Sequence, residues 1–114
     1  MIDTYETQKS ITAWGQRTFG HPHPAHVAAR MTHEMFELDE KFKECGTGPL
    51  AQLSAETLAG LAGECADLGI MLLQIVELLG LDFQTIIDAK MKINRGREWH
   101  LDKKTGTMRH VEGT

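Results

Sequence analysis

The chain has 114 residues, of which 41% are hydrophobic and 25% charged, and its formal net charge is −4. This length and composition predict one folded domain over residues 1–114 and exclude a disordered chain. The acidic balance, without any basic run, argues against nucleic acid or an anionic membrane as a partner. No signal pattern opens the sequence and the two cysteines form no CxxC pair, so we expect a cytoplasmic protein with reduced thiols.

Four helical segments are predicted along the chain, and strand patterns are nearly absent. The first segment runs from about Thr4 to Phe19. The GHPHP segment that follows interrupts the helical pattern, because proline and glycine end helices. The histidines at positions 21, 23 and 26 look like metal ligands as a cluster, but the prolines between them favour an irregular loop.

A short connection joins the second and third helices, so we expect them to pack antiparallel. The second helix runs from about Ala25 to Cys45. The third starts near Ser54, a plausible N-cap, and stops at Gly80, a residue typical of helix ends. The most apolar stretch, residues 68–81, is too short to span a bilayer, so no membrane partner is expected.

Two pairs of acidic residues mark these helices, Glu34/Glu37 in the second and Glu64/Asp67 in the third. Their i, i+3 spacing places both acids of a pair on one helical face, where like charges repel. Both pairs are offset from the apolar stripe of their helix in the same sense. In an antiparallel hairpin they are also level to within about one turn. The four carboxylates therefore form either a solvated face or a site for Mg²⁺ or Mn²⁺, which prefer oxygen ligands.

The fourth helix is expected from Asp82, its N-cap, to about Glu98. One face of this helix begins apolar and then presents Lys90, Asn94 and Arg97 at i, i+4 and i+7. Such a face is either a wall that binds phosphates or a lysine with its charge in solvent beside an exposed arginine. Both interpretations stay open at this point.

The ordered set of ExxE at 34–37, ExxD at 64–67 and KxxxN at 90–94 resembles the all-α nucleoside triphosphate pyrophosphohydrolases, the MazG-like group. The match covers residues 27–99. The resemblance implies an all-α, four-helix MazG-like bundle completed by oligomerisation, with a tetramer favoured over a dimer. The Arg97-Glu98-Trp99 segment and the later His110 resemble a phage and bacterial subgroup associated with purine deoxynucleoside triphosphates such as dATP and dGTP.

The resemblance also implies an activity, the metal-dependent hydrolysis of these triphosphates at the α-phosphorus to a monophosphate and pyrophosphate. The four acids would hold two to three Mg²⁺ or Mn²⁺ ions, and Glu37 would accept the proton of the attacking water. Contacts to the phosphates or the sugar would come from Lys90, Asn94 and Arg97.

Two further residues are candidates for the substrate site. Trp14 either stacks on a nucleobase or is an ordinary core or interface aromatic, and His110 would close over a site, on the same or a neighbouring subunit. The tail that contains His110, residues 99–114, is expected to be irregular. Two other functions stay open: phosphoribosyl-ATP pyrophosphohydrolysis, which shares the fold and chemistry, and a non-enzymatic helical assembly in which the acids are only a solvated face.

Overall fold

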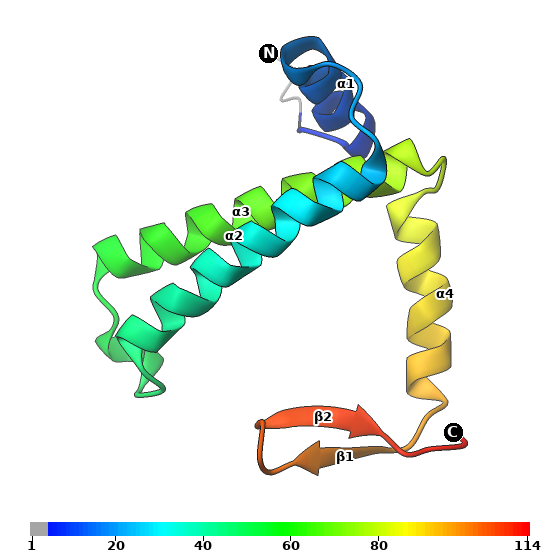
Figure 1. Ribbon diagram of the computed structural model, residues 1–114. Helices are drawn as coiled ribbons and strands as arrows, with labels where there is room; N and C mark the ends of the chain where they lie inside the picture. Colours follow the sequence, from blue (N-terminus) through cyan, green and yellow to red (C-terminus); the bar gives the residue numbers. More distant parts are fainter. Residues whose placement is uncertain (1–4) are drawn as a thin grey trace. The chain divides into compact units, whose positions relative to one another are not determined.

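The computed structural model describes residues 5–114, which form helices and one small sheet (Figure 1). They divide into two compact units, one ending at Leu81 and the other running from Asp82 to Thr114, and each is described by itself. The first unit contains α1 (Gln8–Phe19), α2 (Pro24–Cys45), the 3-10 turn η1 (Leu50–Gln52) and α3 (Ala55–Leu78). The second contains α4 (Phe83–Arg95), β1 (Trp99–Asp102) and β2 (Thr107–His110). The predicted all-α class with four helices is confirmed, whereas the single domain stays a prediction.

The helices α2 and α3 lie side by side as the antiparallel hairpin that the short connection predicts (Figure 1). Pro24 opens α2, where its missing N–H costs nothing, and the Nδ1 of His23 accepts a hydrogen bond from the Ala25 N–H at 3.0 Å. Gly46 closes this helix with φ 74°. The Oγ of Ser54 accepts from the Thr57 N–H at 3.0 Å and so caps α3 as predicted.

The buried hydrophobic residues of the described chain lie along the α2–α3 pair, and α1 adds to this core by packing against α3. The helix α1 packs against α3, with Thr12 and Gly15 buried between them. The Gln8 Nε2 donates to Glu77 Oε1 at 2.8 Å, which ties the start of α1 to the end of α3. The buried hydrophobic residues of this core are Val27, Leu61, Leu68, Met71 and Val76.

Much apolar surface stays exposed on the same helices. Met35, Phe36 and Leu58 are 48%, 60% and 57% exposed. Among the described residues one helix, α3, is long and apolar enough to cross a membrane, although only 22% of its apolar window is buried. Every 18-residue window of α3 contains both Glu64 and Asp67, and carboxylates are costly in hydrocarbon. The exposed apolar face is therefore better suited to a protein partner than to lipid.

Two helix ends differ from their predicted positions. The helix α1 begins at Gln8 because Thr7 and Ser10 form a capping box, with the Thr7 Oγ1 accepting from the Ser10 N–H at 3.0 Å. The predicted start, Thr4, lies outside the described residues. The helix α4 ends at Arg95 and not at Glu98, since Gly96 follows it and its N–H donates to the Ile93 carbonyl at 3.1 Å.

The prediction of an irregular tail was wrong, because β1 and β2 pair antiparallel as a hairpin. Its turn is built locally: Asp102 accepts from the Lys104 N–H at 3.0 Å, and Gly106 adopts φ 72°. Trp99 and Leu101 share one face with Met108 and His110 on the partner strand, which is the period-2 pattern that the sequence carried. The turn lacks the Asn-Gly pair that marks tighter hairpins, and so the signal was missed.

Candidate functional site

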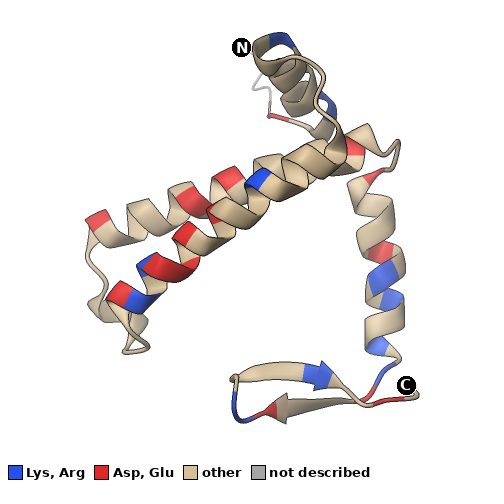
Figure 2. Ribbon diagram, in the orientation of Figure 1, with Lys and Arg blue, Asp and Glu red and all other residues tan. Residues whose placement is uncertain are grey.

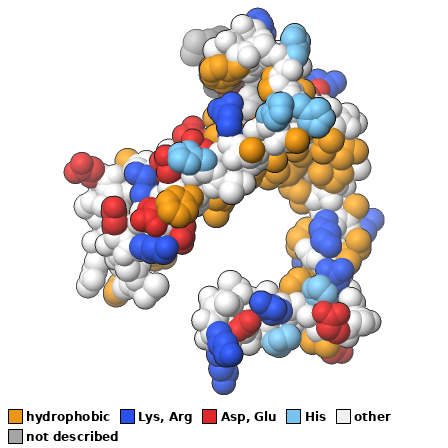
Figure 3. All heavy atoms as spheres, viewed as in Figure 1, with side chains coloured by type: hydrophobic (Ala, Val, Ile, Leu, Met, Phe, Trp, Pro, Cys, Tyr) orange, Lys and Arg blue, Asp and Glu red, His pale blue; other side chains and the backbone are white. Residues whose placement is uncertain are grey.

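Three carboxylates from α2 and α3 meet at one place. One carboxylate oxygen from each of Glu34, Glu37 and Glu64 lies within 4.8 Å of the others, and all three side chains are partly buried. The acidic segments of α2 and α3 are accordingly side by side in Figure 2. We call these three residues the acid cluster. In Figure 3 the acidic side chains and the main hydrophobic patch occupy different parts of the visible surface of the α2–α3 pair.

The acid cluster is electrostatically unfavourable as it stands. Partial burial raises the pKa of Glu34 above its ordinary value, and the negative charges of Glu37 and Glu64, with hydrogen bonds to both, raise it further. The folded protein therefore binds a proton at Glu34 more tightly than an isolated glutamate does. A divalent ion with oxygen ligands would replace that proton and remove the repulsion.

Glu64 offers the strongest sign that the cluster fits a metal ion. Its side chain is only 16% exposed, and its Oε1 lies 4.0 Å from the Lys41 Nζ. Its other oxygen, Oε2, is buried and has no hydrogen-bond partner among the described residues. A buried carboxylate oxygen without a partner is costly in a folded protein, and coordination to a hard cation would satisfy it.

The remaining acid of the predicted set, Asp67, lies one turn beyond Glu64 on α3 and is exposed. It does not belong to the acid cluster, so its role as a metal ligand stays a prediction. Glu37, the predicted proton acceptor, has the His33 Nε2 at 3.3 Å, one helical turn away on α2. Sequence reasoning had not assigned a role to His33 or to Lys41.

The cationic residues of the second unit lie at the end of α4 and just beyond it. Lys90 is exposed, whereas Asn94 and Arg97 are partly buried. The Asn94 Oδ1 and the Arg97 Nε are both buried without a hydrogen-bond partner among the described residues. The Trp99 Nε1–H donates to the Asn94 carbonyl at 2.8 Å and so ties the hairpin to α4. Asn94 and Arg97 thus have hydrogen-bonding capacity that a polar ligand could fill.

His110, the candidate closing residue, packs within its own hairpin. It is the strand partner of Trp99, and the two rings meet edge to face with centroids 5.8 Å apart. Its role over a substrate site stays a prediction.

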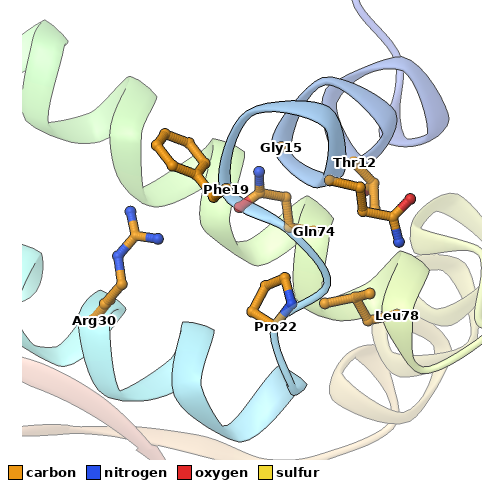
Figure 4. Close-up of a pocket in the computed structure, with 8 residues that line it drawn as sticks. Thr12, Gly15, Phe19, Pro22, Arg30, Gln74 and Leu78 are labelled. Carbon is orange, nitrogen blue, oxygen red and sulfur yellow. The ribbon is translucent and has the colours of Figure 1, made fainter.

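Trp14, the other aromatic candidate, is 48% exposed on α1 and meets Phe19 edge to face at 5.4 Å. Beside them lies a cavity of about 20 Å³, lined among others by Phe19, Arg30 and Gln74 (Figure 4). The Arg30 guanidinium stands over the Phe19 ring at 5.8 Å. A cavity of this size holds about one water molecule and is too small for a nucleobase. The stacking role of Trp14 therefore stays a prediction.

The histidine loop follows the sequence interpretation in part. His21 and His23 precede α2 in irregular backbone, whereas His26 lies in the first turn of that helix. His23 serves as the N-cap, and no metal-binding group that includes these histidines occurs among the described residues.

Comparisons with known proteins show similarity to phage nucleotide hydrolases. No protein-family profile matches the chain. A dATP/dGTP diphosphohydrolase of Salmonella phage PMBT28 is 34% identical over 106 residues, which are 93% of this chain and 31% of that protein. The chain thus spans about a third of the length of that relative. A dATP/dGTP diphosphohydrolase of Cyanophage S-2L is 32% identical over 109 residues, 96% of this chain and 89% of the relative.

A solved structure shows the same fold. It is the Cyanophage S-2L MazG-like pyrophosphohydrolase, bound to dGDP and three catalytic Mn²⁺ ions per active site. The TM-score is 0.68 at 29% identity, and the alignment covers 94% of this chain and 91% of that chain. The similarity therefore extends over the α2–α3 hairpin and the elements on both sides of it.

Proposed function

Because the chain belongs to the MazG-like dATP/dGTP diphosphohydrolase family, we propose that it hydrolyses purine deoxynucleoside triphosphates to the monophosphate and pyrophosphate. The observation that carries the proposal is the acid cluster of Glu34, Glu37 and Glu64, with the unpartnered Glu64 Oε2 inside it. The acidic balance of the chain does not oppose a polyanionic substrate, since divalent ions can bridge two anions.

The acid cluster and Asp67 would hold two to three Mg²⁺ or Mn²⁺ ions. When bound, these ions neutralise phosphate charge and lower the pKa of the attacking water. Glu37 is the candidate to accept the proton of that water. The imidazole of His33 at 3.3 Å is placed to orient the Glu37 carboxylate.

Further residues would contact the substrate outside the acid cluster. Lys90, Asn94 and Arg97 would bind the phosphates or the sugar, supported by the unfilled hydrogen-bonding capacity of Asn94 and Arg97. Trp14 would stack on the base and His110 would close over the site. Residues 1–114 would then work as a single functional domain.

We also propose that the protein is a homo-oligomer in the cytoplasm, most simply a tetramer, within the host cell if the gene belongs to a phage. Support comes from the exposed Phe36 and Leu58 and from a small buried core. The cysteines at 45 and 65 are free thiols, as in reducing compartments. Analytical ultracentrifugation of the full chain tests the proposal, and a monomer at micromolar concentration contradicts it.

The activity is tested with the full chain, Mn²⁺ and a panel of deoxynucleoside triphosphates in ¹⁸O-labelled water. We expect dGTP and dATP to yield monophosphate and pyrophosphate, with the label in the monophosphate because water attacks the α-phosphorus. Label in the pyrophosphate indicates attack at the β-phosphorus and contradicts the mechanism. Absence of pyrophosphate with every substrate contradicts the function.

A further inference from the structure

Lys41 places a positive charge beside the acid cluster. It lies one turn beyond Glu37 on α2, and its Nζ approaches the Glu64 Oε1 to 4.0 Å. Among the described residues no other lysine or arginine comes within 4.0 Å of a cluster carboxylate. A basic segment accordingly adjoins the acidic ones toward the C-terminal end of α2 in Figure 2.

The opposite helix leaves room for this lysine. Gly60 lies one turn before Glu64 on α3, and a Cβ atom at this position would lie 3.8 Å from the Lys41 Nζ. The lysine therefore passes over a residue without a side chain on its way to Glu64. Its side chain is 42% exposed and borders an open cleft of about 630 Å³, so the ammonium has space to move away from Glu64.

The position of Lys41 conflicts with a metal ion. An ion that binds the acid cluster needs Glu64, and it also repels an ammonium group 4.0 Å from that carboxylate. An ion held by the Glu64 Oε2 would draw on the charge of the same carboxylate whose Oε1 faces Lys41, so metal binding should weaken the Lys41–Glu64 pair and leave a positive charge beside the site. The phosphates of a nucleotide bound to the same ions would supply the negative charge that this ammonium then lacks.

We propose that Lys41 couples metal binding to triphosphate binding: its ammonium neutralises Glu64 in the metal-free protein and transfers to the phosphates when metal takes Glu64. This inference rests on the proposed function. It predicts that Lys41 weakens binding of the ion alone and strengthens binding of the ion together with the nucleotide. By linkage the nucleotide then gains as much affinity from the ion as the ion gains from the nucleotide.

The test is calorimetric titration of the full chain with Mn²⁺, alone and in the presence of α,β-methylene dGTP, which is not hydrolysed. The variant Lys41→Met keeps the aliphatic stem and loses the charge. We expect it to bind Mn²⁺ alone about three- to five-fold more tightly, since exposed ion pairs contribute little. The gain in Mn²⁺ affinity on adding nucleotide should fall by about ten-fold relative to the wild type.

Two variants serve as controls. Lys43→Met makes the same change in net charge on the same helix, but Lys43 pairs with Asp39 at 3.2 Å and Glu40 at 3.6 Å, so it should behave as the wild type. Lys41→Arg keeps the charge and should restore most of the coupling. Circular dichroism checks that each variant is folded.

The outcomes separate this inference from the function on which it rests. If Lys41→Met shows the same nucleotide-dependent gain in Mn²⁺ affinity as the wild type and Lys43→Met, the coupling role of Lys41 is wrong while the metal site stands. If the wild type itself binds no Mn²⁺, with or without nucleotide, the proposed function fails.

Discussion

The α2–α3 hairpin and the unit formed by α4, β1 and β2 differ in charge and in packing. Residues up to 81 contain five Lys or Arg and eleven Asp or Glu, whereas residues 82–114 contain seven and five. Every buried hydrophobic residue of the described chain lies on α2 or α3, and none lies between 82 and 114. The comparison teaches that the repelling carboxylates lie on the two helices that carry all of the buried hydrophobic residues described, so apolar packing can offset their repulsion. The cationic residues, in contrast, lie on a unit with little packing of its own.

The two regions should therefore respond differently to substitution. The acid cluster is held in place before a ligand arrives, as a preorganised site requires. The Asn94 Oδ1 and the Arg97 Nε instead find no hydrogen-bond partner within residues 5–114. Loss of a cluster carboxylate should abolish the chemistry, whereas loss of a cation on the second unit should weaken binding.

The largest effect is expected at Glu37. Glu37→Gln removes the proposed proton acceptor and metal ligand with little change in shape, so pyrophosphate release should fall by at least about 100-fold. Glu40→Gln is the matched control, because Glu40 lies on the same helix but pairs with Lys43. A Glu37→Gln protein that stays as active as Glu40→Gln would contradict the proposed catalytic role of Glu37.

A smaller effect is expected at Arg97. Arg97→Gln should raise the KM for dGTP by about ten-fold and change kcat little, because it removes the proposed charge-assisted contact to phosphate. Steady-state kinetics measure both constants, and Lys92→Gln, on an exposed part of α4, should match the wild type. A fall in kcat without a change in KM would place Arg97 in the chemistry and not in binding.

A third effect concerns the stability of the metal-free protein. The pKa of Glu34 is raised above its ordinary 4.5, so the folded state binds this proton more tightly than the unfolded state. The corresponding stability is fully present below pH 4.5 and is lost as the pH rises through the folded pKa.

Glu34→Gln carries no charge to repel its neighbours. In EDTA it should therefore melt about two degrees above the wild type near neutral pH, and the difference should shrink in acid. Thermal unfolding followed by circular dichroism measures the shift. With Mn²⁺ present the wild type should melt above Glu34→Gln, since ion binding stabilises the wild type more. A variant that melts lower than the wild type in EDTA would show that the cluster is not repulsive.

The smallest effect is expected in the hairpin. Arg109 pairs with Asp102 at 3.0 Å, but the arginine is 65% exposed. Arg109→Gln should thus change the free energy of unfolding by less than about 1 kcal/mol. Urea unfolding measures this value, and a larger loss would indicate that the second unit depends on its surface ion pair more than its exposure suggests.

The helical hairpin and its acids were predictable because their signals are local. Ser54 marks a helix start by the hydrogen bond that its side chain offers, and the equal offset of two i, i+3 pairs predicted that carboxylates of α2 and α3 lie close together. Asp67 shows the limit of such reasoning. It lies one turn from Glu64 on the same helix, yet Glu64 is partly buried and Asp67 is exposed.

The remaining features depend on contacts that no local pattern records. The small cavity beside Phe19 is lined by residues from α1, α2 and α3, and Gln74 approaches Gly15 so closely that a Cβ there would lie 2.6 Å from its Nε2. Lys41 of α2 approaches Glu64 of α3 across the facing helix, beside Gly60, a contact that no pattern within one helix records. The hairpin was missed because its turn rests on one aspartate and one glycine.

The helix that carries Glu34 and Glu37 is capped at its N-terminus by an imidazole, not by a hydroxyl or a carboxylate. The His23 Nδ1 can accept the Ala25 N–H only while it keeps its lone pair, so the cap selects the neutral ring with its proton on Nε2. The first turn of α2 thus depends on a single imidazole lone pair to satisfy the Ala25 N–H.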